Sequence, residues 1–529
     1  MHRYDVLRQT HLGKGLGPAL SIRRVRHFPF FSNNMRREYL PIETLPAWQC
    51  LNGIVAKGVA FQKLGSSEYG TDKGSAIVAT EAKSSDENDA TPEILLQIPS
   101  DLFLSLETVH NYAKSDRYLR DVLEALGDFG RTARGAIMIF LLVQLSHTSP
   151  DLRDKHEHVG VSNPWTEYIK FLPPTFPLPT FYTTEEQELL RGTSLAEALD
   201  AKLMSLEREF QNLRQATEDI KWCQQSWWDE ENGSLTIQDW KYVDAAYRSR
   251  MLDIPGSGLA MVPCIDMANH VCGESVKALY DADSDGNAVL QLRWGKHLQP
   301  GEEVTISYGD EKPASEMIFS YGFLDSATTE TREICLHVDM PEDDPLSVAK
   351  KIFCQQNSGV RITAQESEEE PITWESSLVW IACVNEEDGL NFGLAQTTDG
   401  GRELETRWKG EKIQSPDHLR ELLAADPLWE IIQLRAVVLL LERLETQLSL
   451  LQEIEEVIAN LRENEEALTL FFRPEIFDLI IRFRVLEADL LEKAVEELIK
   501  QRTELLGSAS VAAYFSPQTG VAEEAEDFS

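Results

Sequence analysis

The sequence lacks the cysteine patterns that stabilise small secreted domains and zinc-binding domains. It has seven cysteines in 529 residues, an odd number, and no two of them form a Cys-x-x-Cys pair. This count argues against a disulfide framework and against a zinc ribbon or zinc knuckle. We therefore expect an intracellular protein of a reducing compartment without a structural metal ion.

Long hydrophobic runs are also missing. The most apolar uninterrupted run extends from Ala136 to Val143, whereas a membrane-spanning helix needs about 20 apolar residues. No secretory signal peptide is visible in the sequence. We expect no membrane association, and we place the protein in the cytoplasm, the nucleus or both.

Basic residues are scarce relative to acidic ones. Lys and Arg number 50 against 88 Asp and Glu, which gives a formal net charge of −38. Such a surface repels phosphates, so we expect no direct role on nucleic acid. The charge suits a basic protein partner, although acidic residues also serve solubility alone.

The first forty residues depart from this acidic character. They contain eight Lys or Arg residues and only two acids, Asp5 and Glu38. An Arg-rich, acid-poor start is typical of an organellar transit peptide. A disordered extension, or a true start at Met35, explains the same composition, and we prefer these alternatives.

Several nucleotide and metal motifs are missing as well. There is no G-x-G-x-x-G fingerprint, no P-loop and no G-x-S-x-G elbow. The Asp281–Gly286 segment resembles the start of an EF-hand, but Leu292 stands where calcium needs a glutamate. Asp266 and His270 have the four-residue spacing of helical metal ligands, but no third ligand follows in register. We therefore expect a hairpin turn at Asp281–Gly286 and no metal site.

Apolar periodicity divides the remaining chain into alternating regions. Helical spacing dominates residues 106–239, and a Pro-rich stretch, Phe171–Pro179, interrupts it. After about Leu336 the pattern is mainly helical, with apolar stripes over Ile432–Leu461 and Glu475–Leu506. Short strand-like runs lie on either side of the first helical region, in Trp48–Leu64, Ala76–Thr80, Ile94–Ile98, Val276–Tyr280, Ala288–Trp294 and Val304–Tyr308. The fold class is therefore α+β, with a β-rich unit split by a helical insertion.

Four short motifs stand out because of their order and spacing. They are Ser249-Arg250, Leu259–His270 (LAMVPCIDMANH), Gly301–Gly309 (GEEVTISYG) and Ser320–Asp325 (SYGFLD). Each is a weak signal alone, but together they resemble the SET-domain protein methyltransferases, and more narrowly the Rubisco large-subunit methyltransferase-like branch. Residues 165–172 and 181–193 are similar to the insertion of that branch, and the resemblance extends from about Leu45 to Leu506.

The resemblance implies four regions along the chain. Residues 1–44 are expected to be a basic, disordered extension. A SET catalytic domain is expected over residues 45–330, with its helical insertion at about 106–239. An all-helical substrate-binding domain follows at 331–508, and residues 509–529 form an acidic tail.

The resemblance also implies a reaction and a site. We expect S-adenosylmethionine-dependent methylation of a lysine in a non-histone protein, with a basic ribosomal or translation-related protein as the expected substrate. Tyr308 would be the catalytic tyrosine, and Tyr321 would form a wall of the lysine channel. The expected cofactor-binding residues are Gly74, Ser75, Ala76, Arg250, Asp266, Asn269, His270 and Phe323. Two alternatives remain open, a histidine methyltransferase of the same fold and a catalytically weak SET-like scaffold.

One departure from the family pattern concerns the first motif. The family usually reads Gly-x-Gly-Leu, whereas residues 74–77 read Gly-Ser-Ala-Ile. Ala76 adds a methyl group close to the expected cofactor. We expect weaker cofactor binding, and a shifted loop if this position requires a positive φ.

Overall fold

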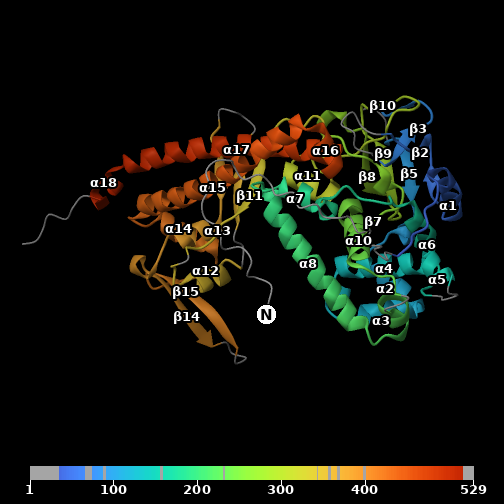
Figure 1. Ribbon diagram of the computed structural model, residues 1–529, viewed down its shortest axis with the longest axis horizontal. Helices are drawn as coiled ribbons and strands as arrows, with labels where there is room; N and C mark the ends of the chain where they lie inside the picture. Colours follow the sequence, from blue (N-terminus) through green and yellow to red (C-terminus); the bar gives the residue numbers. More distant parts are fainter. Residues whose placement is uncertain are drawn as a thin grey trace, which may run out of the picture.

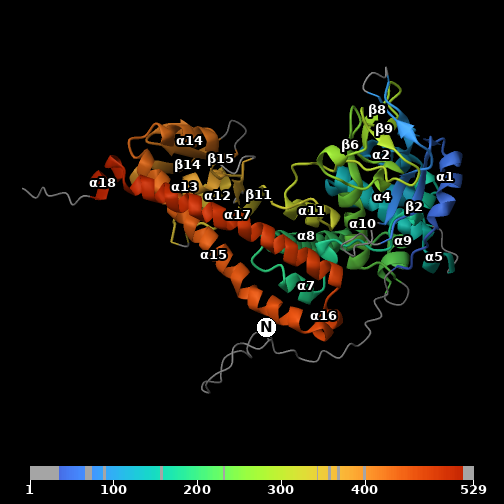
Figure 2. The same cartoon turned by 90° about the horizontal axis from the view of Figure 1, so that it is seen from above.

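The computed structural model describes residues 35–65, 74–86, 91–154, 159–229, 233–341, 343–355, 359–365, 370–396 and 401–515. The basic residues before Met35, residues 366–369 and the acidic residues after Phe515 lie outside this range. The chain forms two lobes that long helices connect (Figures 1 and 2). No helix in the described part combines the length and apolarity needed to cross a bilayer.

The first lobe contains several small antiparallel sheets. The largest has the strand order β1-β5-β9-β8, and the pairs β2-β3, β4-β10 and β6-β7 surround it. The strands are β1 (Val55–Ala56), β2 (Val59–Lys63), β3 (Ser75–Ala79), β4 (Lys83–Ser84), β5 (Ile94–Ile98), β6 (Met251–Ile254), β7 (Gly258–Met261), β8 (Ala278–Ala282), β9 (Ala288–Leu292) and β10 (His297–Leu298). The turn between β8 and β9 is the predicted hairpin, since the Asp283 carboxylate accepts hydrogen bonds from the backbone N–H groups of Asp285 and Asn287.

Two strand predictions in this lobe are wrong. Residues 48–51 belong to helix α1 (Leu45–Leu51), which begins with a proline in its first turn and buries Leu45 and Trp48 at helical spacing. Residues 304–308 form no strand of their own. Their neighbourhood makes isolated bridges, Val78 to Glu303 and His270 to Ile306.

Helices separate the two halves of this β-rich unit, as predicted. They are α2 (Leu106–Ser115), α3 (Arg117–Ala125), α4 (Ala133–Thr148), α5 (Pro150–Asp154), α6 (Pro164–Tyr168), α7 (Thr184–Glu188), α8 (Ser194–Thr217), α9 (Lys221–Cys223) and α10 (Ile237–Arg250). Helix α4 carries the most apolar run of the sequence. Its residues 135–146 are all buried in the hydrophobic core of the first lobe, called the first core below. The Pro-rich stretch between α6 and α7 contains no α-helix, as its prolines predict.

The segment just before α1 belongs to this first core. Met35 and Ile42 are buried in it. The Arg37 guanidinium donates to the buried Asp239 carboxylate at 2.7 Å, and its Cζ lies 3.6 Å from the centre of the Tyr242 ring. The expectation of a disordered extension up to residue 44 is therefore wrong for residues 35–44.

The second lobe is largely helical, but it is not all-helical as predicted. Its helices are α12 (Ser347–Phe353), α13 (Ser377–Ala382), α14 (Pro416–Ala424), α15 (Trp429–Glu463), α16 (Glu465–Phe471), α17 (Pro474–Leu506) and α18 (Ala509–Phe515), the last within the predicted acidic tail. Two three-stranded sheets accompany them, formed by β11 (Glu333–His337), β12 (Gly359–Thr363), β13 (Thr373–Glu375), β14 (Leu390–Gln396), β15 (Arg402–Trp408) and β16 (Glu411–Ile413). In β11 only Ile334 and Leu336 are buried, the two-residue period of a strand that is covered on one face.

A separate apolar cluster joins the two lobes. It brings Ile480 and Phe483 of α17 together with Leu195 of α8 and Ile318 of α11 (Ala314–Tyr321). Figure 2 shows α17 running beside α15 and reaching α11 at the boundary between the lobes. Helix α17 therefore belongs to the second lobe along most of its length but supports the first lobe at this end.

Candidate active site

The distant sequence motifs meet around residues 301–308. On one side, Val304 N–H donates to the Ile77 carbonyl of β3 at 2.8 Å. On the other side, Ile306 N–H donates to the Asn269 carbonyl at 2.9 Å, and Val271 N–H donates to the Ile306 carbonyl at 3.1 Å. This segment therefore lies between β3 and residues 269–271, and it brings three of the predicted motifs together.

Tyr308 is held at both its backbone and its hydroxyl. Its backbone N–H donates to His270 Nδ1 at 2.9 Å, and its hydroxyl donates to the Ala268 carbonyl at 2.8 Å. The rings of Tyr308 and His270 stack with centroids 5.1 Å apart. Burial raises the pKa of the Tyr308 phenol well above its ordinary value, against a smaller lowering effect of Arg250. The phenol therefore remains neutral at physiological pH.

Tyr321 and Phe323 reach Tyr308 from the end of α11. The Tyr321 ring lies 4.5 Å from the Tyr308 ring between centroids, and the Phe323 ring lies 6.4 Å from it. Gly322 between them adopts φ = 80°, and a Cβ there would meet the Pro177 carbonyl oxygen at 2.5 Å. Only glycine fits this reversal of the chain, which turns both aromatic side chains toward Tyr308. Burial raises the pKa of Tyr321 to about 12.

Arg250 and Asp266 form a buried ion pair beside Tyr308. Arg250 Nη1 donates to Asp266 Oδ2 at 3.0 Å and to the Asp266 carbonyl at 2.9 Å, and the Asp266 side chain is fully buried. Tyr168 donates its hydroxyl to the other carboxylate oxygen at 2.5 Å. Burial opposes the guanidinium charge, but Asp266 outweighs it and holds the pKa of Arg250 above its ordinary value. Asp266 therefore holds the Arg250 guanidinium in place and stabilises its positive charge.

A small cavity of about 50 Å³ connects these groups. Arg250, Asp266, Tyr308 and Tyr321 line it, together with Ser249, Met251, Leu252, Ile265, Ala268, Tyr280, Ile306 and Ser307. The volume is enough for a few water molecules or the end of a side chain. The wall thus combines aromatic rings with one buried cation.

Asn269 and the Gly74–Ala76 motif do not line this cavity, and they lie on opposite sides of residues 301–308. Asn269 Nδ2 donates to Glu303 Oε1 at 2.7 Å, and Glu303 forms a bridge with Val78 of β3. Gly74 adopts φ = 71°, whereas Ala76 is fully buried within the regular strand β3 and is paired with Gln62. The positive φ of this motif falls on the glycine that is present, so Ala76 introduces no backbone strain.

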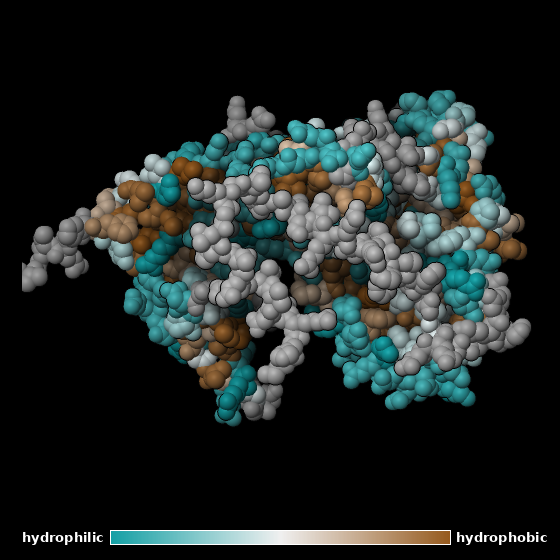
Figure 3. Space-filling view, in the orientation of Figure 1, coloured by the Kyte–Doolittle hydropathy of each residue, from teal (hydrophilic) through white to brown (hydrophobic). Residues whose placement is uncertain are grey.

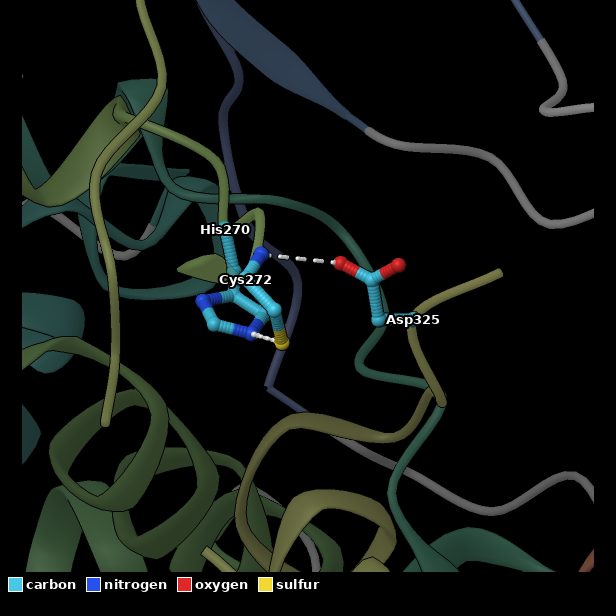
Figure 4. Close-up of side chains that lie close together, drawn as sticks. All are labelled: His270, Cys272 and Asp325. Atoms are coloured by element: carbon cyan, nitrogen blue, oxygen red, sulfur yellow. Dashed lines mark hydrogen bonds between the residues drawn. The ribbon is translucent and has the colours of Figure 1, made fainter. Parts of the chain in front are cut away.

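His270 belongs to a hydrogen-bonded group that the sequence did not reveal. Its Nε2 lies 3.1 Å from the Cys272 sulfur, and the Cys272 backbone N–H donates to Asp325 Oδ2 at 3.2 Å (Figure 4). Ligand atoms of these three residues lie within 4.8 Å of one another. The sequence offered no third ligand near His270, because Asp325 is 55 positions away and only the fold brings it close.

Three other residues that support the site were not predicted from the sequence. Glu303 lies in the GEE turn of the Gly301–Gly309 motif, and its carboxylate accepts a hydrogen bond from the Asn269 side chain. Tyr168 lies in the insertion and braces Asp266. Tyr280, on strand β8, lines the cavity. Glu303 and Tyr168 had a usable signal, because both belong to segments already singled out in the sequence.

Comparisons with known proteins show several similar chains, although no protein-family model matches. SET domain-containing protein 8 of Schizosaccharomyces pombe is 26% identical over 346 residues, 65% of this chain and 74% of that protein. A chloroplastic fructose-bisphosphate aldolase-lysine N-methyltransferase of Arabidopsis thaliana is 23% identical over 273 residues, half of each chain. An actin-histidine N-methyltransferase of Gallus gallus is 23% identical over 363 residues, 67% of this chain and 54% of that protein. The chain thus spans about half the length of the latter two relatives.

Solved structures share the architecture over nearly the whole chain. The SET domain of LSMT bound to lysine and AdoHcy superposes with a TM-score of 0.59 at 16% identity, covering 91% of this chain and 96% of that one. Rubisco LSMT bound to AdoMet gives a TM-score of 0.57 at 15% identity, covering 88% and 92%. Both the motif arrangement and the helical second lobe agree with this likeness. The chain has the SET-domain fold seen in these LSMT structures.

Proposed function

We propose that the protein is an S-adenosylmethionine-dependent protein methyltransferase that acts on a lysine side chain. The observation that carries this proposal is the neutral, doubly anchored Tyr308 beside a small cavity with a second tyrosine and a buried arginine in its wall. The sequence likeness to lysine and histidine N-methyltransferases supports the reaction class.

The residues around the cavity suit the amino-acid end of the cofactor. Arg250 Nε is buried and has no hydrogen-bond partner among the described residues, although the same side chain lines the cavity. A buried donor of this kind fits a carboxylate, because an unpaired polar group costs about 1–3 kcal/mol when buried. Asn269 and the Gly74–Ala76 motif would contact the remaining parts of the bound molecule. When bound, S-adenosylmethionine supplies an electrophilic methyl group on a sulfonium.

Methyl transfer requires a neutral amine, because an ammonium ion has no free electron pair. With a reference lysine pKa near ~10.4, deprotonation at pH 7 costs about 4.6 kcal/mol. The Tyr308 and Tyr321 rings form an aromatic wall that disfavours the desolvated ammonium and so lowers its pKa. The same rings accommodate a methylated cation through their π faces.

Tyr308 orients the amine and does not act as a strong base. Its hydroxyl hydrogen is committed to the Ala268 carbonyl, so its oxygen is left as an acceptor for an N–H of the substrate. The raised pKa keeps the phenol protonated throughout the physiological range. Holding the nitrogen within ~3–3.5 Å of the methyl carbon, and in line with it, is the main contribution we assign to this residue.

The second lobe is the proposed docking region for the protein substrate. It exposes large apolar side chains, including Val348 and Ile352 of α12, Leu394 of β14 and Phe515 of α18. Figure 3 shows apolar patches over β14 and around α18, surrounded by hydrophilic surface. The net charge of −38 favours a substrate rich in Lys and Arg. A ribosomal or translation-related protein remains the predicted class.

Histidine methylation is the second candidate, and the likeness to an actin-histidine N-methyltransferase favours it. An imidazole is already neutral over much of the physiological range, so it needs less desolvation than a lysine. Acid hydrolysis of the labelled product, followed by amino-acid analysis, separates methyl-lysine from methyl-histidine. Label found only in methyl-histidine would replace the lysine assignment.

The decisive experiment measures label transfer from methyl-labelled S-adenosylmethionine to proteins of a lysate or to purified ribosomes. We expect transfer by the wild type and a loss of about 100-fold in Tyr308→Phe. Tyr242→Phe is the matched control, because Tyr242 also donates a buried hydroxyl to a backbone carbonyl, that of Pro173, but lies outside the cavity. Equal transfer by wild type and Tyr308→Phe would remove the role of Tyr308. Absence of both transfer and calorimetric cofactor binding would favour the scaffold alternative.

A further inference from the structure

The group formed by His270, Cys272 and Asp325 has the composition of a metal site, but its hydrogen bonds point to another role. His270 Nδ1 accepts a hydrogen bond from Tyr308 N–H, so the proton of the neutral ring lies on Nε2. A metal would need a lone pair at Nε2, which instead faces the Cys272 sulfur at 3.1 Å as a donor. Burial, together with Asp325 and Asp310, also raises the pKa of the Cys272 thiol to about 11, away from the thiolate that metals prefer.

The group extends as a chain of contacts away from Tyr308. The Cys272 backbone N–H donates to one carboxylate oxygen of Asp325 at 3.2 Å. The Ala327 backbone N–H donates to the other at 2.8 Å and closes a tight turn. Asp325 therefore fixes both the turn after Phe323 and the segment that carries Cys272, and Figure 4 shows the second of these contacts.

An arginine of the second lobe holds the far side of this turn. Arg482 of α17 donates through Nη2 to the carbonyls of Asp325 at 2.6 Å and Thr328 at 2.5 Å, and it lies 3.3 Å from the carbonyl of Ser326. One charged donor group thus contacts three carbonyls of the turn, those of residues 325, 326 and 328. Hydrogen bonds from a charged donor are about twice as strong as neutral ones.

We propose that Arg482 is a positioning residue that couples helix α17 to Tyr308 through Asp325, Cys272 and His270. The proposal rests on the function proposed above, because positioning matters only if Tyr308 orients a reacting amine. Each link is a direct contact, and the last one holds the backbone from which the Tyr308 side chain projects. A displacement of about 1 Å at a reacting group can cost 100-fold in rate, so a partial relaxation suffices for a measurable effect.

The first test needs no activity and follows hydrogen exchange at the Tyr308 amide by mass spectrometry. Arg482→Met keeps an apolar stem but removes every donor. We expect it to speed exchange in a peptide that covers residues 304–310 by about tenfold. Arg473→Met is the control, because Arg473 is the N-cap residue of α17 and contacts the insertion, through Glu186 and the Phe181 carbonyl, but not the Asp325 turn. Unchanged exchange in Arg482→Met, or equal acceleration in Arg473→Met, would overturn the proposal.

The second test measures methyl-transfer kinetics in the full-length protein. We expect Arg482→Met to lower kcat about tenfold with KM for the protein substrate within twofold, whereas Arg482→Lys, which keeps a donor for the carbonyls, retains most of the rate. Asp325→Asn cannot accept both backbone N–H groups, so combining it with Arg482→Met should lower kcat no further than the slower single variant. Additive losses would show that the two residues act independently and would refute the coupling. If the wild type transfers no methyl group, the function fails, while the exchange result still decides the coupling.

Discussion

The buried pair of Arg250 and Asp266 allows the site to be tested without knowledge of the substrate. In Asp266→Asn a single amide oxygen replaces two carboxylate oxygens, so the side chain can no longer accept from both the Tyr168 hydroxyl and Arg250 Nη1. The guanidinium also loses its counter-charge while it stays buried. Removing one partner of a buried pair costs about 3–5 kcal/mol. We therefore expect the free energy of unfolding to fall by that amount at pH 7.5.

The measurement is urea unfolding, followed by tryptophan fluorescence and by far-ultraviolet circular dichroism. Trp165 lies 5.2 Å from Tyr168 between ring centroids, so its emission reports on this region. Glu453→Gln is the control, because its partner Arg191 and Glu453 itself are both 54% exposed, and such pairs contribute about 0–1 kcal/mol. If Asp266→Asn destabilises the protein no more than Glu453→Gln, the pair is not the buried brace inferred here.

Three further predictions follow from other parts of the molecule. Burial raises the pKa of Glu487 from 4.5 to about 7, so the protonated carboxyl stabilises the fold and this contribution is lost as the pH rises from about 4.5 through 7. Glu487→Gln can still form hydrogen bonds with both the N–H and the hydroxyl of Ser194. Measured by thermal unfolding, the free energy of unfolding of this variant should exceed that of the wild type by at most about 3 kcal/mol at pH 8 and by almost nothing at pH 4. Ala76→Gly should leave calorimetric cofactor affinity within about twofold and cost roughly 1 kcal/mol of stability, so a large gain in affinity would contradict the strand geometry of Ala76. The rate of association with a Lys-rich protein substrate, measured by stopped flow, should fall as salt is added, and a salt-independent rate would show that the acidic surface serves solubility alone.

Much of the site could be predicted from the sequence because its motifs are short and lie in a fixed order. The rings of Tyr308, Tyr321, Phe323 and His270 lie close together, while the roles that the resemblance implies for them stay predictions. Their supports could not be predicted in the same way. Asp325 meets Cys272 only through the fold, and a single sequence shows no link between positions so far apart.

The fold predictions failed where local pattern and tertiary context disagree. The predicted strand-like run Trp48–Leu64 starts inside helix α1, because Leu45 and Trp48 bury one face of that helix in the core of the first lobe. The two sheets of the second lobe were missed because their strands lie among stronger helical signals. The long helices α15 and α17 were predicted well, because each has a sustained apolar stripe.

The second lobe contributes to the site as well as to the proposed docking of the substrate. Tyr321 and Phe323 pack against the cluster that contains Phe483 of α17, so one wall of the site rests on a helix from the other end of the sequence. Arg482, one residue away, holds the turn that follows these aromatic side chains. Because Tyr321 and Phe323 share this close-packed cluster with α17, a movement of the helix displaces them as well. A shift of α17 on substrate docking would therefore reach Tyr308 by two routes, through the packed aromatic rings and through the hydrogen bonds that end at His270.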